Sequence, residues 1–271
     1  MIAHLINTDV YGRSVIRLYL EYRERDFDFL SNATSLFLEN IDRVLIVSCF
    51  PIPPMQIAET DGPPGALALY RTVEKLGGKA EILTCKKIQE ALKDFKIDFA
   101  QTPSIENYSL LISVETPGRA KDGKYYSMSA LEIEVSPFDE LFLKARELGI
   151  PTIGIGDGGN EIGMGNIRDL VCKHIKFGEK IGSVVEVDSL VISAVSNWGA
   201  YGLIAQASIE LGKNMIESWS EEEEKVLKAL VSSGVIDGVT KKPELSVDGV
   251  PLEVHKSFLT LLNSIVENKI R

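Results

Sequence analysis

The chain has 271 residues, 45% of them apolar, which is enough to bury a sizeable core in a single α/β domain. Its 29 basic and 39 acidic residues give a formal net charge of −10, which argues against nonspecific binding to nucleic acid or to an anionic membrane. The three cysteines show no zinc-site spacing, and no signal peptide or membrane-spanning run is evident, so we expect a cytoplasmic protein.

Strand-like and helix-like segments alternate along the chain. Residues 12–40 carry apolar side chains at helical spacing, and residues 1–40 are expected to form a helical cover. Short apolar runs that are typical of buried parallel strands follow at residues 44–47, 80–83, 110–114, 152–155 and 190–194. Helical patterns lie between or after them at residues 63–76, 137–148, 166–176 and 199–212. This alternation predicts a doubly wound, mostly parallel sheet with helices on both faces and a ligand site at the carboxyl ends of the strands.

The C-terminal part is expected to be mostly helical. A capping-box pattern from Ser220 to Glu223 predicts a helix over residues 220–232 with a solvated, acidic start. Residues 234–250 have the weakest pattern and are interpreted as a loop or an added hairpin. Residues 251–271 carry apolar side chains at helical spacing, so we expect a C-terminal helix that docks on the body of the single domain, residues 1–271.

Four loops that follow strands are unusual in composition. The first, residues 50–65, is stiffened by several prolines and presents Glu59, Thr60 and Asp61. An ordinary helix start capped by Asp61 or Gly62 is the alternative interpretation. The long proline-rich approach and Glu59 are not needed for a cap, so they favour a ligand site.

Two further loops offer polar side chains that suit a carboxylate or an amide. Arg119, in residues 115–126, can hold a carboxylate through two parallel hydrogen bonds, and a mobile solvent-facing loop is the equal alternative. Asn197, in residues 196–202, can orient an amide or carboxyl group, and Trp198 can exclude water. The alternative is that Asn197 only caps the helix that follows it.

The loop at residues 154–166 holds six glycines in thirteen residues. The absence of a Cβ at Gly156, Gly158 and Gly159 lets backbone N–H groups converge on one small oxygen of a ligand. Asn160 adds a side-chain amide to the same turn. The pattern therefore predicts a nest for a carboxylate or an oxyanion.

Two acids stand within this glycine-rich loop. Asp157 and Glu161 suit an ammonium group or a proton transfer, so a zwitterionic amino acid would satisfy both signs of charge in the loop. Taken alone, Asp157 is typical of a turn and Glu161 of a first helical turn. A dinucleotide on the G-x-G-x-x-G spacing is a weaker alternative, because its pyrophosphate would meet both acids and no basic residue in the loop.

Two blocks of this sequence resemble a known family. They are Glu59-Thr-Asp-Gly-Pro-Pro-Gly-Ala66 and Gly156-Asp-Gly-Gly-Asn-Glu-Ile-Gly-Met-Gly165, both long and unusual in composition. They are similar to the C-terminal domain of the D-glutamate cyclase family, and the resemblance extends over most of the chain. It implies a lyase that converts D-glutamate into 5-oxo-D-proline and water. Eukaryotic members look like two-part proteins whose N-terminal part resembles a hydro-lyase family.

The chemistry of this cyclisation suggests catalytic roles for the acids. We hypothesise that Asp157 or Glu161 accepts the amine proton and that Glu59 or Asp61 protonates the leaving hydroxyl. Cys49 is interpreted as a buried structural thiol rather than a nucleophile, because no histidine lies near it in the sequence.

The remaining polar groups are expected to bind the substrate. Arg119 would anchor the α-carboxylate, and the amides of Gly158 and Gly159 would stabilise the oxyanion. The full substrate-binding set is Gly156, Gly158, Gly159, Asn160, Arg119, Asn197 and Thr60.

We expect an amino-acid substrate and no required cofactor or structural metal. A divalent Mg²⁺ or Mn²⁺ on Asp157 and Glu161 is allowed, as is a homo-oligomer. The alternatives are a nucleotide-dependent or dinucleotide-dependent enzyme that uses the glycine-rich loop, and a sensor that binds an amino acid without chemistry.

Overall fold

The computed structural model describes residues 1–12 and 15–271. Within this part of the chain, a five-stranded sheet has the order β4-β1-β5-β6-β7, and all its neighbouring strands are parallel. The strands are β1 (Arg43–Val47), β4 (Lys79–Leu83), β5 (Leu110–Val114), β6 (Thr152–Gly156) and β7 (Ser189–Ile192). The five predicted strands and the doubly wound α/β class are therefore confirmed. Nearly every strand residue is buried, as expected for a parallel sheet covered on both faces.

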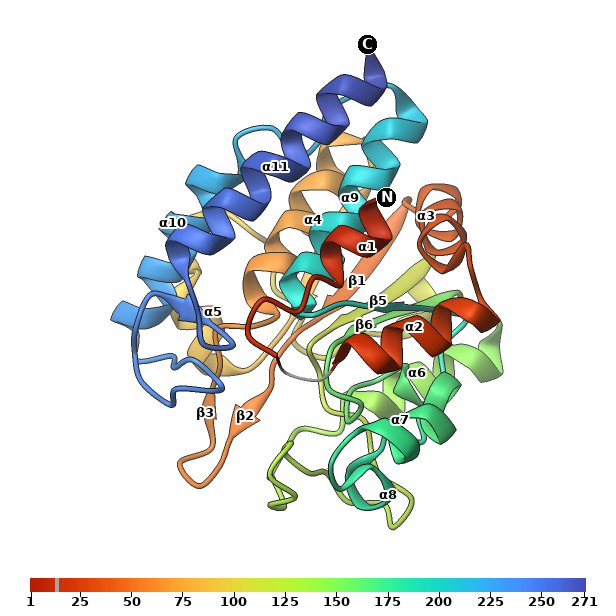
Figure 1. The fold of residues 1–271 in the computed structure, drawn as a ribbon, viewed down its shortest axis with the longest axis vertical. Coiled ribbons are helices and arrows are strands. Elements are labelled where there is room, and N and C mark those ends of the chain that lie inside the picture. Colours follow the sequence, from red (N-terminus) through yellow and green to blue (C-terminus); the bar gives the residue numbers. More distant parts are fainter. Residues whose placement is uncertain (13–14) are drawn as a thin grey trace.

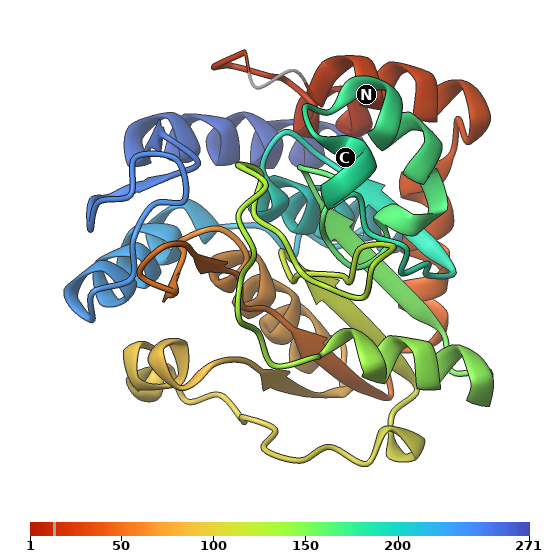
Figure 2. The same ribbon diagram turned by 90° about the horizontal axis from the view of Figure 1, so that it is seen from below.

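Helices lie on both faces of this sheet. One face carries α3 (Phe29–Glu39), α4 (Pro63–Lys75) and α9 (Ser196–Leu211) (Figure 1). The opposite face carries α6 (Asp139–Leu148), and Figure 2 shows α4 and α6 on opposite sides of the strands. The reason is topological, because the right-handed crossovers from β1 to β4 and from β5 to β6 run in opposite directions.

Three further helices form an outer layer over α9 and α4. They are α1 (Ile2–Ile6), α10 (Trp219–Ser232) and α11 (Leu252–Ile270) (Figure 1). Trp198 of α9 stacks on Phe258 of α11 with ring centroids 4.2 Å apart, and its indole N–H donates to His255 at 2.9 Å. The side chain that the sequence suggested as a water-excluding wall of the site therefore lies under the C-terminal helix instead.

The predicted N-terminal cover contains α1, α2 (Val15–Arg25) and α3. α2 packs against α7 (Arg168–His174) at the edge of the molecule, whereas α3 packs against β7. Residues 13 and 14, which fall in the predicted helical stretch, lie outside the described residues.

The capping-box prediction is wrong about Glu223. α10 begins at Trp219, and Glu223 turns inward, where it is fully buried and its carboxylate accepts a hydrogen bond from the Tyr201 hydroxyl of α9. The exposed acidic start is confined to the residues before it, such as Glu221. A helical face cannot be assigned from a run of identical charges, because the packing partner decides which of them is buried.

Several short elements complete the fold. The remaining helices are α5 (Lys86–Ala91), α8 (Gly178–Ile181), η1 (Lys93–Phe95), η2 (Ile105–Asn107) and η3 (Met164–Ile167). Two small hairpins are β2 (Pro51–Ile52) with β3 (Ile57–Ala58), and β8 (Ser246–Val247) with β9 (Val250–Pro251). The weakly patterned residues 234–250 thus lead into a hairpin. Among the described residues, no helix has the length and apolar character needed to cross a bilayer.

The strand order creates a crevice between β1 and β5. The chain moves outward in one direction from β1 to β4 and in the other direction from β5 to β7, so the loops that leave β1 and β5 diverge. Residues 48–62 follow β1, and Glu115 follows β5 directly with a positive φ of 45°. Such backbone strain at a strand end is typical of functional sites.

Candidate active site

Buried acids gather at the carboxyl ends of β1, β5 and β6. Among the described residues, six such side chains are close enough for their charges to interact, and each is at most 6% exposed. They are Glu59, Asp61, Glu115, Asp157, Glu161 and Asp248. We call these residues the acid cluster. The two family blocks supply four of them, and their meeting at one edge of the sheet is what the sequence predicted.

Two triplets within the acid cluster are especially close. One carboxylate oxygen from each of Asp61, Asp157 and Asp248 lies within 4.8 Å of the others. The same holds for Glu115, Asp157 and Glu161. Asp157 belongs to both triplets and therefore joins them into one continuous group.

Burial and mutual repulsion disfavour the charged forms of these acids. Burial raises the pKa of Glu115 well above its usual value, and the negative charges of Asp157 and Glu161 raise it further. Burial also raises the pKa of Asp61, with Asp248 as the next cause. So many carboxylates in a low-dielectric site must share protons or be neutralised by a cation. The acid cluster is thus suited to a positively charged ligand.

The glycine-rich loop holds one of the chain's own carboxylates. Glu161 accepts hydrogen bonds from the amides of Gly158 at 2.6 Å and Gly159 at 2.7 Å. Gly159 has a φ of 109°, and a Cβ on Gly156 would approach the Glu161 carboxylate to 3.1 Å. The nest is real, but the amides expected to stabilise a substrate oxyanion have Glu161 as their partner.

The same arrangement weighs against a dinucleotide. The glycine-rich loop continues into the 3₁₀ helix η3 rather than into a long α-helix whose N-terminus could bind phosphate. The loop amides at Gly158 and Gly159 already bind a carboxylate. Burial raises the pKa of Glu161, and the hydrogen bonds from these amides only partly offset this rise. A negatively charged phosphate in the same buried nest would therefore be unfavourable.

Asp61, Thr60 and Asn197 contact backbone groups of the protein. The Asp61 carboxylate accepts from the amides of Ser196 at 2.8 Å and Asn197 at 2.9 Å, at the start of α9. The Asn197 side-chain oxygen accepts from the amides of Gly62 and Gly65 at the start of α4. The Thr60 hydroxyl donates to the Ser246 carbonyl at 2.8 Å. Both side chains thus cap a helix, but not the one that the capping alternative gave them: Asp61 caps α9, and Asn197 caps α4.

A cavity of about 100 Å³ opens beside the acid cluster. Glu59 and Asp248 line it, and so does Asn160, whose side-chain NH₂ donates to the Tyr126 carbonyl at 2.6 Å. Asn160 is 1% exposed, and its side-chain oxygen has no hydrogen-bond partner among the described residues. A buried acceptor of this kind is costly unless a ligand satisfies it. Exposed Lys241 stands at the rim of this cavity.

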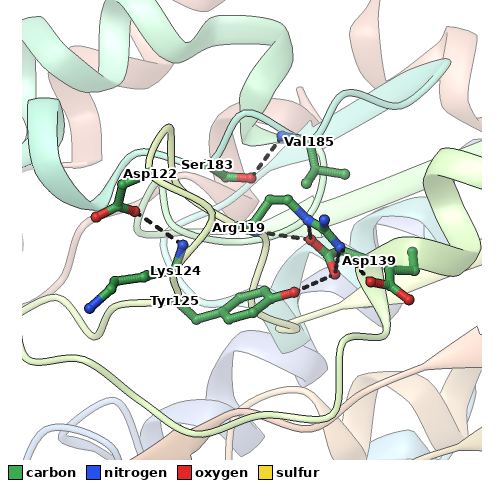
Figure 3. Close-up of polar contacts among 8 residues, drawn as sticks. Arg119, Asp122, Lys124, Tyr125, Asp139, Ser183 and Val185 are labelled. Carbon is green, nitrogen blue, oxygen red and sulfur yellow. Dashed lines mark hydrogen bonds and ion pairs between the residues drawn. The ribbon is translucent and has the colours of Figure 1, made fainter.

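Arg119 is paired within the protein (Figure 3). Its guanidinium donates to both carboxylate oxygens of fully buried Asp139, at 2.6 and 3.1 Å, and its backbone amide donates to the same side chain at 3.1 Å. Tyr125 donates to Asp139 at 2.7 Å. The two-pronged geometry expected for a substrate carboxylate is therefore used on Asp139, and Arg119 does not line the cavity beside the acid cluster.

Three residues of this site were not predicted from the sequence. Glu115 begins the loop from which the sequence singled out Arg119, although the place of Glu115 directly after β5 was a usable signal. Asp248 and Lys241 belong to residues 234–250, whose weak pattern hid them. This segment folds around Asp237, whose carboxylate accepts from the amides of Val239, Thr240 and Gly249.

The fold and the site define a doubly wound α/β protein with a carboxylate-rich pocket at the switch point of its sheet. Comparison with known proteins identifies the family within this class. The family model described as D-glutamate cyclase-like, C-terminal, matches residues 2–263. The chain belongs to this family.

Individual relatives give the scale of the similarity. The chain is 31% identical to "D-glutamate cyclase, mitochondrial" from Homo sapiens over 292 aligned residues. This alignment covers 86% of this chain and 47% of the human protein. The chain thus spans about half the length of that curated relative. A crystal structure of an exopolyphosphatase-related protein from Bacteroides fragilis superposes with a TM-score of 0.45 and 8% identity, covering 90% of this chain and 60% of that one.

Proposed function

We propose that this protein is a D-glutamate cyclase-like lyase that converts D-glutamate into 5-oxo-D-proline and water. The observation that carries the proposal is that Glu59 and Asn160, one from each family block, line the same cavity together with Asp248. Family membership supports the reaction class. A cavity lined by carboxylates and an unsatisfied amide oxygen suits the ammonium group of an amino acid.

The reaction needs both ends of one flexible molecule held together. The α-ammonium loses a proton, its nitrogen attacks the γ-carboxyl carbon, and a C–N bond forms while one carboxyl oxygen leaves as water. Holding the amine against the carboxyl group removes much of the entropic barrier. The site must therefore bind the α-carboxylate, take a proton from the amine and give one to the leaving oxygen.

We assign these tasks to residues that face the cavity or adjoin it. Asp157 or Asp248 accepts the amine proton, and Glu59 protonates the leaving hydroxyl. The Asn160 side-chain oxygen accepts a hydrogen bond from the ammonium. Asp61 and Glu161 become positioning residues, because their oxygens accept backbone amides.

Lys241 takes the role that the sequence analysis gave to Arg119. Its ammonium lies 3.5 Å from the Pro53 carbonyl, too long for a strong hydrogen bond, and the side chain is exposed at the cavity rim. It is thus available to bind the α-carboxylate as a point charge. The cavity holds roughly three water molecules, so a bound glutamate would extend toward Lys241 and exposed Met128.

A divalent cation fits the acid cluster as a second ligand. Oxygen donors alone, without histidine or cysteine, suit Mg²⁺ or Mn²⁺, and both triplets offer carboxylate oxygens at close range. The Asn160 oxygen adds a neutral donor nearby. Such a cation would neutralise the carboxylates and polarise the γ-carboxyl group as a Lewis acid.

Chiral chromatography of a D-glutamate incubation tests the proposal. We expect 5-oxo-D-proline to accumulate, faster with Mn²⁺ or Mg²⁺ than with a chelator, and Glu59→Gln to lower kcat by about 100-fold or more with the fold intact. Binding of D-glutamate in a thermal-shift assay without any 5-oxoproline would instead identify a sensor. Stabilisation by NAD or ATP but not by D-glutamate would reject the proposal in favour of the nucleotide alternative.

A further inference from the structure

Cys49 and Cys85 lie side by side beyond the ends of two neighbouring strands. β1 and β4 run parallel with Val47 opposite Leu83, so two residues further along the chain Cys49 faces Cys85. The Ser48 amide donates to the Leu83 carbonyl at 3.1 Å, which carries the pairing past the strand ends. Both thiols line the same cavity, and each is among the groups that shift the pKa of the other. A single stretch of sequence does not show this pair, because its members stand at positions 49 and 85.

Both thiols are accessible from a cavity. They are half-buried and line a space of about 450 Å³. This cavity also contacts Pro51, Ile57 and Ala58 of the β2–β3 hairpin, whereas the cavity beside the acid cluster contacts Phe50, Ile52 and Glu59. The hairpin thus separates the two cavities, and the larger one holds no member of the acid cluster.

The two thiols differ in acidity. The hydrogen bond from Cys49 is the largest cause that lowers the pKa of Cys85 to about 7. The same hydrogen bond and burial raise the pKa of Cys49, and the charge of Glu59 raises it further. Lys86 and Lys87 of α5 and Glu134 across the cavity are the other charged groups that line this space. One reactive thiolate beside one protonated thiol is the arrangement of an attacking and a resolving cysteine.

We propose that Cys49 and Cys85 form a redox-active thiol pair that a peroxide oxidises reversibly to a disulfide. The Cys85 thiolate attacks one peroxide oxygen, the O–O bond breaks, and hydroxide leaves as water after taking a proton, which produces a sulfenic acid. The Cys49 sulfur then attacks the sulfenic sulfur, an S–S bond forms, and a second water leaves with the Cys49 proton. The pair loses two electrons, and the peroxide is reduced to water.

The disulfide would tie the β2–β3 hairpin to the start of α5. Cys49 directly precedes Phe50, and the Phe50 carbonyl accepts the Glu59 amide at 3.1 Å. The covalent bond would therefore restrict one wall of the cavity beside the acid cluster. Amide hydrogen exchange measures this restriction of the cavity wall, and the measurement does not depend on the proposed cyclisation of D-glutamate.

Intact-mass and peptide-mapping spectrometry of the peroxide-treated protein test the pair. We expect the loss of two hydrogens, a Cys49–Cys85 cross-linked peptide, and full reversal by dithiothreitol. Cys172→Ser is the matched control and should oxidise like the wild type, while Cys49→Ser should stop at the sulfenic acid of Cys85. A cross-link to Cys172, or overoxidation of Cys85 to sulfinic acid in the wild type without a cross-link, would overturn the proposal.

Two further measurements use the folded protein: alkylation of the reduced form, and amide exchange in the reduced and oxidised forms. Iodoacetamide at neutral pH should label Cys85 about tenfold faster than Cys172, because burial raises the Cys172 pKa. Cys49→Ser should slow the labelling of Cys85, since it removes the thiol that stabilises the thiolate. The Glu59 amide should exchange more slowly in the oxidised than in the reduced protein. Equal labelling rates for all three cysteines would contradict the assigned roles, and equal exchange would contradict the coupling.

Discussion

Asp61 and Asn197 cap each other's helices: the Asp61 side chain caps the start of α9, and the Asn197 side chain caps the start of α4. Asp61, just before α4, accepts the first amides of α9. Asn197, in the first turn of α9, accepts the amides of Gly62, which precedes α4, and Gly65, in the first turn of α4, at 3.0 and 2.8 Å. Both side chains are buried. The two helix starts that flank the acid cluster are therefore held in one fixed relationship.

Removal of the Asn197 cap should destabilise the protein. Asn197→Ala leaves the buried Gly65 amide without its acceptor and the Gly62 amide with the Asp61 carboxylate alone. We therefore expect the free energy of unfolding in urea to fall by about 2 kcal/mol. Exposed Asn268 in α11 is the control, and Asn268→Ala should change it by no more than about 0.5 kcal/mol. A stable Asn197→Ala protein whose KM alone changes would favour the substrate-binding role inferred from the sequence.

Arg119 should matter for stability rather than for substrate affinity. Arg119→Met removes the cation paired with the fully buried Asp139 carboxylate, which keeps the Tyr125 hydroxyl and the backbone amide of residue 119 as donors. We expect a loss of about 3 kcal/mol in unfolding free energy and an unchanged KM for D-glutamate. The exposed ion pair of Arg25 with Asp169 provides the comparison, where Arg25→Met should cost less than about 1 kcal/mol. An increase in KM without destabilisation would restore Arg119 as the substrate anchor.

Lys241 should contribute to substrate binding. Loss of its charge in Lys241→Gln should raise the KM for D-glutamate about tenfold, with a smaller change in kcat, because the α-carboxylate is bound equally in the ground and transition states. Lys242→Gln is the matched control, since Lys242 is also exposed but does not line the cavity. Identical KM values for the two variants would remove Lys241 from the site.

The acid cluster should lower the stability of the protein without a cation and bind a divalent cation. Glu115→Gln removes one buried, mutually repelling carboxyl group, so we expect a higher melting temperature than the wild type at pH 8 in the presence of a chelator. Mn²⁺ at about 100 times its Kd should stabilise the wild type by roughly 2.7 kcal/mol and the variant much less. Glu244→Gln, at an exposed position, should behave like the wild type. Equal Mn²⁺ shifts in all three proteins would argue against the cation site.

Glu223 should make the protein less stable as the pH rises. Burial raises its pKa to about 7 in the folded state, from 4.5 in the unfolded chain. The unfolded chain therefore releases its proton first, so stability is greatest below about pH 4.5 and is lost progressively up to about pH 7. Compared with the wild type, Glu223→Gln should gain about 3 kcal/mol at pH 8 and nothing at pH 4. A constant difference across this range would contradict the assignment.

Local patterns in the sequence predicted the elements of this fold and one part of its site. Each strand is a short apolar run, because both faces of a parallel sheet are buried, and this property is visible residue by residue. The carboxyl edge of the sheet follows from the alternation of strands and helices. The convergence of Glu59 with Asp157 could therefore be predicted, and so could the family.

The partners of the side chains depended on the tertiary structure. Arg119 binds Asp139, because packing brings this carboxylate, 20 residues further along the chain, to the guanidinium. Glu161, in contrast, fills the glycine nest from within the same loop, two and three residues from the amides that it accepts. Asp248 joins the acid cluster from a segment without any pattern of its own. The sequence by itself determined which residues can carry charge and where the backbone can turn. Only the folded chain decided which opposite charges meet, since electrostatic partners are chosen by distance in space and not by separation along the chain.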